Sequence, residues 1–202
     1  MAFQGRLEVI KGPMFSGKST EILRRLTIEA EMGLRVLYIN HTTDDRSKDS
    51  FSTHNPLYKS SDCIDGKIKF SFTNSLEYII ECGKINEYDV IGIDEANFFG
   101  DNLFSPVIKM IEEYNKHVIV SGLPLDFERK MFGQISQLGD LADEVVTLKS
   151  CCKMCITQTP PLRSDALFTH RISKENTSQI ETGGKDKYMP VCRKCYLELN
   201  KK

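Results

Sequence analysis

An eight-residue motif near the amino end constrains the fold more than any other feature of the sequence. Residues 12–19 read GPMFSGKS and fit the pattern G-x-x-x-x-G-K-[ST] in full. An apolar run, residues 6–11, precedes the motif, and a helical period begins at Lys18. Strand, loop and helix in that order are the context that a phosphate-binding loop requires, so we predict a parallel α/β fold. A glycine turn before an ordinary helix is the plainer alternative.

The residue types in this loop suit a bound nucleotide. Glycines let the backbone wrap around an anion, and the N–H groups at the helix N-terminus point at it. Lys18 is expected to reach the β- and γ-phosphates, and Ser19 to coordinate Mg²⁺. The predicted nucleotide-binding residues come from this loop and from a second, acidic segment: Gly12, Pro13, Met14, Phe15, Ser16, Gly17, Lys18, Ser19, Asp94, Glu95, Ala96 and Asn97.

The acidic segment follows an apolar run, residues 90–93, that reads as a buried strand. Asp94 is predicted to hold Mg²⁺ together with Ser19 at the carboxyl edge of the sheet. Glu95 is the candidate general base, because a carboxylate beside bound Mg²⁺ can accept a proton from an attacking hydroxyl. The alternative is that both acids only supply the negative charge that a helix N-terminus favours.

Apolar patterns elsewhere alternate between strands and helices. Strands are predicted at residues 34–40, 67–72, 89–94, 117–121 and around 144–148, and helices at 75–82 and 103–114. Residues 41–62 are polar without a period and read as a long loop. We therefore predict a P-loop (RecA-like) parallel sheet flanked by helices in residues 1–149, a nucleotide-binding α/β domain. The polar tail, residues 150–202, has too few large apolar residues for a core of its own.

Two cysteine pairs compensate for the weak core of the tail. Cys152-x-x-Cys155 and Cys192-x-x-Cys195 have the spacing of two zinc knuckles, and four thiolates form a closed, structural site. Cys151 is a rival by adjacency, but only Cys152 has the two-residue gap to Cys155. One alternative is that the cysteines bind no metal, and another is that they form a nucleic-acid-binding zinc ribbon. The tail lacks the stripe of basic and aromatic residues that such a ribbon uses.

Charge and cysteine usage bound the partners and the compartment. Lys plus Arg number 27 against 28 Asp plus Glu, so no global positive field attracts nucleic acid or an anionic membrane. No segment approaches the ~20 apolar residues of a membrane span, and the amino end lacks the apolar stretch of a signal peptide. An odd count of 7 cysteines without an export signal indicates a reducing compartment. We expect a cytoplasmic protein.

Five separated stretches together resemble the type II (cytosolic, zinc-containing) thymidine kinase family. They are residues 12–20, Asp44-Asp45-Arg46 with residues 51–54 behind it, residues 93–99, residues 123–133, and the cysteine pairs that enclose Gly183-Gly184 and Tyr188. The resemblance runs from about Leu7 to Tyr196. It implies transfer of the ATP γ-phosphate to the 5′-hydroxyl of thymidine, with Mg²⁺ and a structural zinc, in nucleotide salvage. Deoxyuridine is a second expected acceptor.

The resemblance also implies roles for individual residues. Glu95, Lys18, Arg46 and Asp44 are the expected catalytic residues, although a solvated charge cluster is the alternative for Asp44 and Arg46. A zinc-anchored lasso is expected over the base, and the implied substrate contacts are Met14, Leu123, Phe127, Thr169, Gln179, Ile180, Glu181, Thr182, Gly183 and Tyr188. For Met14 and Leu123 a simple core role is equally compatible with the sequence. A homotetramer and feedback inhibition by thymidine triphosphate are implied as well.

Two departures from the family pattern leave alternatives open. Asn97 stands where glutamine is common, and Glu181-Thr182 replaces residues that are often small and apolar. A deoxynucleoside kinase of altered base preference is therefore the second reading. A nucleotide-binding switch, or a zinc-ribbon module that binds nucleic acid, is the rival from another class.

Overall fold

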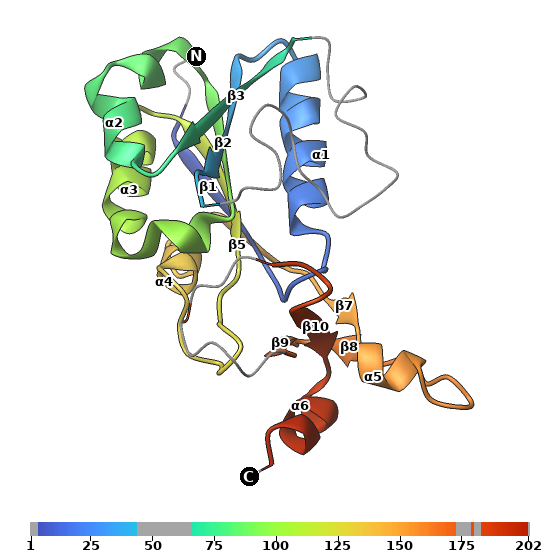
Figure 1. Ribbon diagram of the computed structural model, residues 1–202. Coiled ribbons are helices and arrows are strands. Elements are labelled where there is room, and N and C mark those ends of the chain that lie inside the picture. The colour runs from blue at the N-terminus through green and yellow to red at the C-terminus, as the bar shows by residue number, and fades with distance from the viewer. Residues whose placement is uncertain (1–3, 44–65, 173–178, 180–182, 202) are drawn as a thin grey trace.

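A computed structural model describes residues 4–43, 66–172, 179 and 183–201 (Figure 1). Its main body is a sheet of six parallel strands in the order β3-β2-β4-β5-β1-β6. The strands are β1 (Arg6–Lys11), β2 (Val36–His41), β3 (Ile68–Thr73), β4 (Val90–Asp94), β5 (His117–Gly122) and β6 (Glu144–Thr147). Because all six run the same way, the loops that follow them meet at one edge of the sheet.

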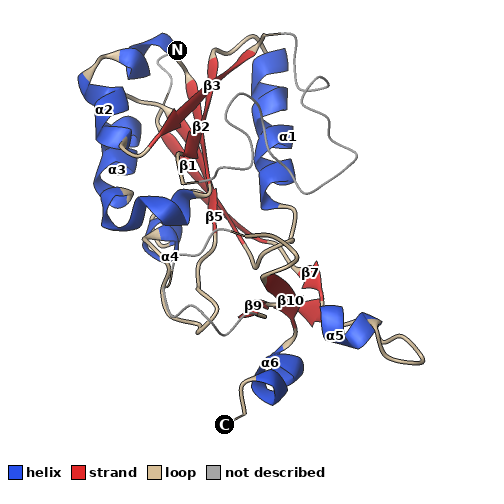
Figure 2. Cartoon of the chain, viewed as in Figure 1, coloured by secondary structure: helices blue, strands red, loops and turns tan. Residues whose placement is uncertain are grey.

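Helices cover both faces of the sheet (Figures 1 and 2). The helix α1 (Lys18–Glu31) lies on one face, and the opposite face carries α2 (Leu76–Glu81), α3 (Phe104–Glu112) and α4 (Ile135–Gly139). Short 3₁₀ segments occupy η1 (Lys84–Glu87) and η2 (Ala96–Asn102). The predicted fold class, a P-loop parallel sheet flanked by helices, is confirmed.

Alternation along β1 explains the two layers. Leu7 and Val9 belong to the buried cluster under α2, α3 and α4, whereas Ile10 belongs to the cluster under α1. Gly92 of β4 lets α1 approach closely, because a Cβ there would lie 2.4 Å from a methyl carbon of Leu26. The sheet is therefore buried on both faces, as parallel sheets require.

Residues 150–201, which we call the cysteine module, form a separate set of small elements beyond the carboxyl edge of the sheet (Figure 1). They are β7 (Ser150–Cys151), α5 (Lys153–Ile156), β8 (Asp165–Ala166), β9 (Phe168–Arg171), β10 (Tyr188–Val191) and α6 (Arg193–Leu199). Strands β9 and β10 pair antiparallel, as do β7 and β8. The apolar cluster here is small and includes three of the four knuckle cysteines together with Tyr196.

The predicted strands and long helices all form, within two residues at each end. The pattern did not predict η1, η2, α4 or the short elements of the cysteine module. None of the helices in the described ranges is long and apolar enough to span a bilayer.

Candidate active site

The phosphate-binding motif forms the turn between β1 and α1. Phe15 and Gly17 both have positive φ, 62° and 87°, so the backbone turns sharply before the helix begins at Lys18. The Nζ of Lys18 lies 2.9 Å from the carbonyl oxygen of Pro13, which folds this buried side chain back over the loop. The sequence therefore places a cation and a helix N-terminus at one turn.

Two details of this turn suit an anion. Gly12 has no room for a side chain, because a Cβ would lie 2.6 Å from the carbonyl oxygen of Leu148 and 2.8 Å from the Oγ of Ser16. The Ser16 hydroxyl oxygen is buried without a hydrogen-bond partner in the described part of the chain. A buried hydroxyl normally has a partner, so its isolation here fits a loop that closes around a polar ligand.

Asp94 is held at the end of β4 by neighbouring strands. It is 1% exposed, and its carboxylate accepts hydrogen bonds from the hydroxyl of Tyr38, at 2.9 Å, and from that of Ser121. Tyr38 comes from β2 and Ser121 from β5, the two strands that flank β4. These two hydrogen bonds fix the position of the Asp94 carboxylate, an oxygen ligand of the kind that Mg²⁺ prefers.

The backbone turns out of the sheet at Glu95, directly after the last residue of β4. Its φ is 48° and ψ 36°, a left-handed conformation that is uncommon outside glycine. Strand β4 ends at Asp94, so Glu95 escapes the alternation that would send its side chain to the opposite face. It is half-buried, while Asp94 is buried. A strained backbone at an acidic residue is often a feature of functional sites.

The strand register relates the acid pair to the phosphate-binding turn. Ile93 pairs with Val120, and Val120 pairs with Val9, so Asp94 is level with Ser121 and Ile10. Only β5 separates β4 from β1. At a strand spacing of about 4.8 Å, Asp94 is about 10 Å across the sheet from the end of β1. The acids and the turn thus lie at the same edge of the sheet, with one strand between them.

His41 adds a neutral ring at the end of β2. Burial lowers the pKa of His41, and its Nδ1 accepts a hydrogen bond from the amide of Thr43 at 3.1 Å. The ring packs edge-on against Phe99, with centroids 4.7 Å apart. A neutral imidazole brings no positive charge to compete with a cation at Asp94.

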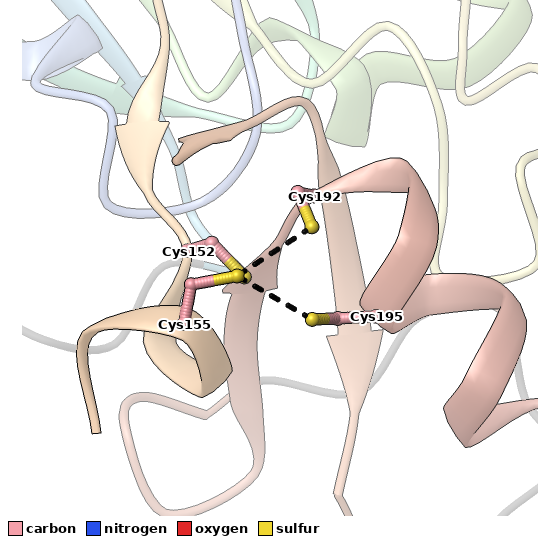
Figure 3. A group of neighbouring side chains, drawn as sticks. All are labelled: Cys152, Cys155, Cys192 and Cys195. Carbon is pink, nitrogen blue, oxygen red and sulfur yellow. Dashed lines mark hydrogen bonds between the residues drawn. The ribbon is translucent and has the colours of Figure 1, made fainter. Parts of the chain in front are cut away.

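The four knuckle cysteines converge, as Figure 3 shows. The sulfur atoms of Cys152, Cys155, Cys192 and Cys195 all lie within 4.8 Å of one another. Cys155 lies 3.6 Å from Cys195 and 3.8 Å from Cys192, sulfur to sulfur. A tetrahedral zinc with bonds of about 2.3 Å separates its sulfurs by about 3.8 Å. The donor set therefore fits zinc, and Cys151 is exposed and outside the cluster.

Each knuckle is built on a short helix. Cys152 is the N-cap of α5 and Cys192 is the N-cap of α6, so the second cysteine of each pair lies in the first helical turn. The clustered thiols shift one another's pKa values in opposite directions: burial raises the pKa of Cys192, but the backbone hydrogen bond from Cys195 and the thiol contacts outweigh it and lower the net value, whereas burial and the neighbouring thiols raise the pKa of Cys195. A thiolate is the form that zinc binds.

The cysteine module touches the phosphate-binding turn directly. The backbone N–H of Met14 donates to the hydroxyl of Thr169 in β9 at 3.0 Å, and the hydroxyl of Ser150 donates to the carbonyl oxygen of Phe15 at 3.0 Å. Thr169 is 5% exposed, and a hydroxyl that accepts one bond can still donate one. The predicted substrate residue Thr169 therefore lies beside the predicted nucleotide residue Met14.

Residues 123–133, which we call the hairpin, join the acidic segment to the cysteine module. The amide of Leu123 donates to the side-chain oxygen of Asn97 at 2.9 Å. At the other side, the hydroxyl of Tyr196 donates to the carbonyl oxygen of Phe127 at 2.7 Å. Leu123 is buried and Phe127 is half-buried. Asn97 and Ala96 are buried as well. The hydrogen bond from Leu123 to the buried Asn97 side chain therefore holds the start of the hairpin against η2.

Gln179 and Gly183 are the two described residues of the stretch 179–183 within the predicted lasso. The side-chain amide of Gln179 donates to the carboxylate of Asp126 at 2.7 Å, which links the lasso to the hairpin. Gly183 packs against Lys187, whose side chain a Cβ at Gly183 would meet at 2.5 Å. Ile180, Glu181 and Thr182 lie outside the described residues, as do Asp44 and Arg46.

The structure adds residues that the sequence did not single out. Asp126 is 5% exposed and organises the hairpin by accepting the amides of Glu128 and Lys130. Phe98 and Phe132 stack edge to face, with centroids 5.9 Å apart, between η2 and the hairpin. Only the position of these residues within motif stretches could have drawn attention to them, because their contacts depend on tertiary packing.

Known proteins resemble this chain over most of its length. A family model described as Thymidine kinase matches residues 5–196. A thymidine kinase from Amsacta moorei entomopoxvirus is 36% identical over 191 residues, which cover 94% of this chain and 97% of the viral protein. Thymidine kinase a from Arabidopsis thaliana is 38% identical over 198 residues, which cover 96% of this chain and 75% of the plant protein.

Similarity in three dimensions extends to a more distant protein. The crystal structure of the flagellar accessory protein FlaH from Methanocaldococcus jannaschii superposes with a TM-score of 0.51. The alignment covers 73% of this chain and 72% of that chain at 15% sequence identity. At that identity the likeness supports the fold alone.

Proposed function

The chain belongs to the thymidine kinase family and phosphorylates thymidine, and we propose that the carboxyl edge of its sheet carries out the transfer with Glu95 as the general base. The observation that carries this assignment is the left-handed turn at Glu95. It separates two adjacent carboxylates at the edge of the sheet that also bears the phosphate-binding turn. Asp94 is then the buried, hydrogen-bonded side chain of the pair, and Glu95 is the more exposed one.

The proposed step is an in-line phosphoryl transfer. The 5′-oxygen of thymidine forms a bond to the γ-phosphorus of ATP, and the bond from that phosphorus to the β–γ bridging oxygen breaks, which releases ADP. Glu95 accepts the proton of the 5′-hydroxyl as the new bond forms. The products are thymidine monophosphate and ADP.

The phosphate-binding turn is proposed to hold the triphosphate. The backbone N–H groups of residues 12–19 and the ammonium of Lys18 supply positive charge, and the fit of Gly12 and Ser16 supports an anion there. Ser19 and Asp94 are the proposed magnesium ligands; bound Mg²⁺ neutralises charge on the phosphate oxygens. Asp44 and Arg46 keep the roles that the family resemblance implies.

The cysteine module is proposed to hold the nucleoside. Thr169 and Tyr188 from its paired strands, with Leu123 and Phe127 from the hairpin, would surround the base and sugar. The hydrogen bonds Thr169–Met14 and Gln179–Asp126 support this reading, because they tie the module to both neighbouring segments. Zinc bound by the four cysteines would fix the base of the module, so that its backbone groups keep their positions.

Further properties follow from the resemblance as proposals. The chain is proposed to divide near Ser150 into a nucleotide-binding domain, residues 1–149, and a zinc-stapled lasso domain, residues 150–202. A homotetramer, feedback inhibition by thymidine triphosphate and action in cytoplasmic nucleotide salvage are proposed with it. Clustered cysteines support a reducing compartment. Sedimentation of the zinc-loaded protein with and without thymidine triphosphate tests the homotetramer and its response to the triphosphate.

Two measurements test the function itself. A panel of deoxynucleosides with labelled ATP identifies the acceptor, and thymidine is expected to acquire the label fastest. Glu95→Gln is expected to keep ATP binding and to lose ~10²- to 10⁴-fold in kcat, the usual cost of removing a general base. Glu113→Gln, at an exposed position after α3, is the matched control and should act like wild type. Near-normal turnover of Glu95→Gln would overturn the assigned role.

A further inference from the structure

Arg171 occupies a buried position between two residues of the proposed nucleoside site. It ends β9, is 5% exposed, and pairs across the ribbon with Tyr188 of β10. Its guanidinium carbon lies 3.7 Å from the ring centroid of Phe127 and 5.5 Å from that of Tyr188. Its Nη2 donates to the hydroxyl of Tyr188 at 3.0 Å.

One planar group thus performs two tasks. The face of the guanidinium lies on the Phe127 ring, and its edge directs an N–H at the Tyr188 hydroxyl. Arginine can do both at once because its fork is flat and rigid, whereas the ammonium of lysine is a compact point charge on a flexible stem. Phe127 comes from the hairpin and Tyr188 from the cysteine module, so Arg171 joins two segments that are far apart in sequence.

The strand period explains why Arg171 faces the site. Thr169 and Arg171 are two residues apart on β9 and are both buried, while Phe168 and His170 between and before them are less so. Residues i and i+2 share one face of a strand. Thr169 contacts the phosphate-binding turn and Arg171 contacts the hairpin. This face of β9 therefore touches both parts of the proposed site.

We propose that Arg171 is a positioning residue that sets the spacing and orientation of Phe127 and Tyr188 around the nucleoside. The proposal rests on the proposed function, in which those two side chains contact thymidine. Arg171 acts through them and takes no part in the phosphoryl transfer. Its loss is therefore expected to weaken thymidine binding and to leave ATP binding and kcat nearly unchanged.

Arg129 provides a matched control within the same interface. Its guanidinium carbon lies 4.5 Å from the ring centroid of Tyr196, so it also joins the hairpin to the cysteine module by a cation–π contact. It is exposed, and neither of its aromatic partners, Tyr196 and Phe168, is among the proposed substrate residues. A purely structural role of Arg171 would lower stability without a selective rise in the KM for thymidine, and Arg129→Lys gives the effect of losing a cation–π contact at this interface outside the proposed nucleoside site.

The test is steady-state kinetics of zinc-loaded Arg171→Lys, Tyr188→Phe and the double variant, with Arg129→Lys as control. Arg171→Lys is expected to raise the KM for thymidine by about five- to thirtyfold, the range of a desolvated cation–π contact with its hydrogen bond, with kcat and the KM for ATP within twofold. Tyr188→Phe removes only the hydroxyl and keeps both rings. It therefore tests the hydrogen bond from Arg171 even where Arg171→Lys folds poorly. In free-energy terms, the rise in the KM for thymidine in the double variant is expected to be less than the sum of the rises in the two single variants, because both single variants remove the same hydrogen bond.

Different failures point to different errors. An unchanged KM for thymidine in Arg171→Lys would overturn the positioning role, as would equal effects of Arg171→Lys and Arg129→Lys; where Arg171→Lys folds poorly, an unchanged KM for thymidine in Tyr188→Phe overturns it instead. A Phe127→Ala variant tests the site itself. If Phe127→Ala leaves the KM for thymidine unchanged, then the proposed nucleoside site is wrong. If it raises that KM and Arg171→Lys does not, then only the role of Arg171 falls.

Discussion

The anchoring of α1 to the sheet gives a sharp prediction at Glu8. This residue of β1 is 5% exposed, and its carboxylate contacts Arg25 of α1, Arg6 at 3.0 Å and the Nε2 of His117 at 3.1 Å. Burial raises the pKa of Glu8, but the hydrogen bonds with His117 and Arg25 outweigh it and lower the pKa from 4.5 to about 2. Because α1 begins with Lys18, this contact supports the helix that carries Lys18 and Ser19, the proposed phosphate and magnesium residues.

The size and sign of the effect follow from that pKa. A fall from 4.5 to about 2 corresponds to about 3 kcal/mol of the free energy of unfolding. A lowered pKa in the folded state means that this contribution is fully present above pH 4.5 and is lost as the pH falls toward 2. Glu8→Gln should therefore destabilise the protein by about 3 kcal/mol at pH 7 and by about 1 kcal/mol at pH 3.

Urea unfolding of both proteins at a series of pH values measures the difference directly. Taking the difference between variant and wild type removes the effect of acid on the zinc site, which the two proteins share. Glu128→Gln is the control, because its ion pair with Lys130 is exposed and should contribute little at any pH. A destabilisation by Glu8→Gln that is the same at pH 3 and pH 7 would refute the reasoning, since an uncharged contact would then be responsible.

Two further predictions concern the metal and the phosphate-binding turn. Cys192→Ser should lower the zinc content and weaken thymidine binding more than ATP binding, whereas Cys151→Ser should change neither, as zinc analysis and binding assays of both variants will reveal. Equal losses for the two ligands would count against separate roles. Gly12→Ala should raise the KM for ATP and cost ~1–3 kcal/mol of stability, since its Cβ would lie 2.6 Å from a carbonyl oxygen. Gly139→Ala, where the nearest atom is 3.8 Å away, should do neither, and an unchanged KM in Gly12→Ala would contradict a close-fitting turn.

Periodicity and motif spacing predicted most of the secondary structure in residues 1–149. Four apolar residues repeat at helical spacing, and all four lie on the buried face of α1: Ile22, Leu23, Leu26 and Ala30. Strand β4 could be predicted because its apolar residues are buried on both faces and leave a continuous run. The cysteine cluster was predictable for a different reason. Two C-x-x-C pairs specify their ligands by spacing alone, whatever lies between them.

Contacts between the halves could not be predicted in the same way, because no local pattern encodes them. Arg171 and Arg129 are both arginines close to aromatic residues in the folded chain, yet one is buried and the other exposed. Their surroundings depend on how the hairpin meets β9, and β9 is held by the hydrogen bond between Thr169 and Met14 and lies between the two converging cysteine pairs. A local motif fixes the atoms of its own segment, whereas the proposed nucleoside site draws side chains from three segments. It follows that variants altering base preference should concentrate in the hairpin and the paired strands β9 and β10, while those that abolish turnover concentrate in the motifs.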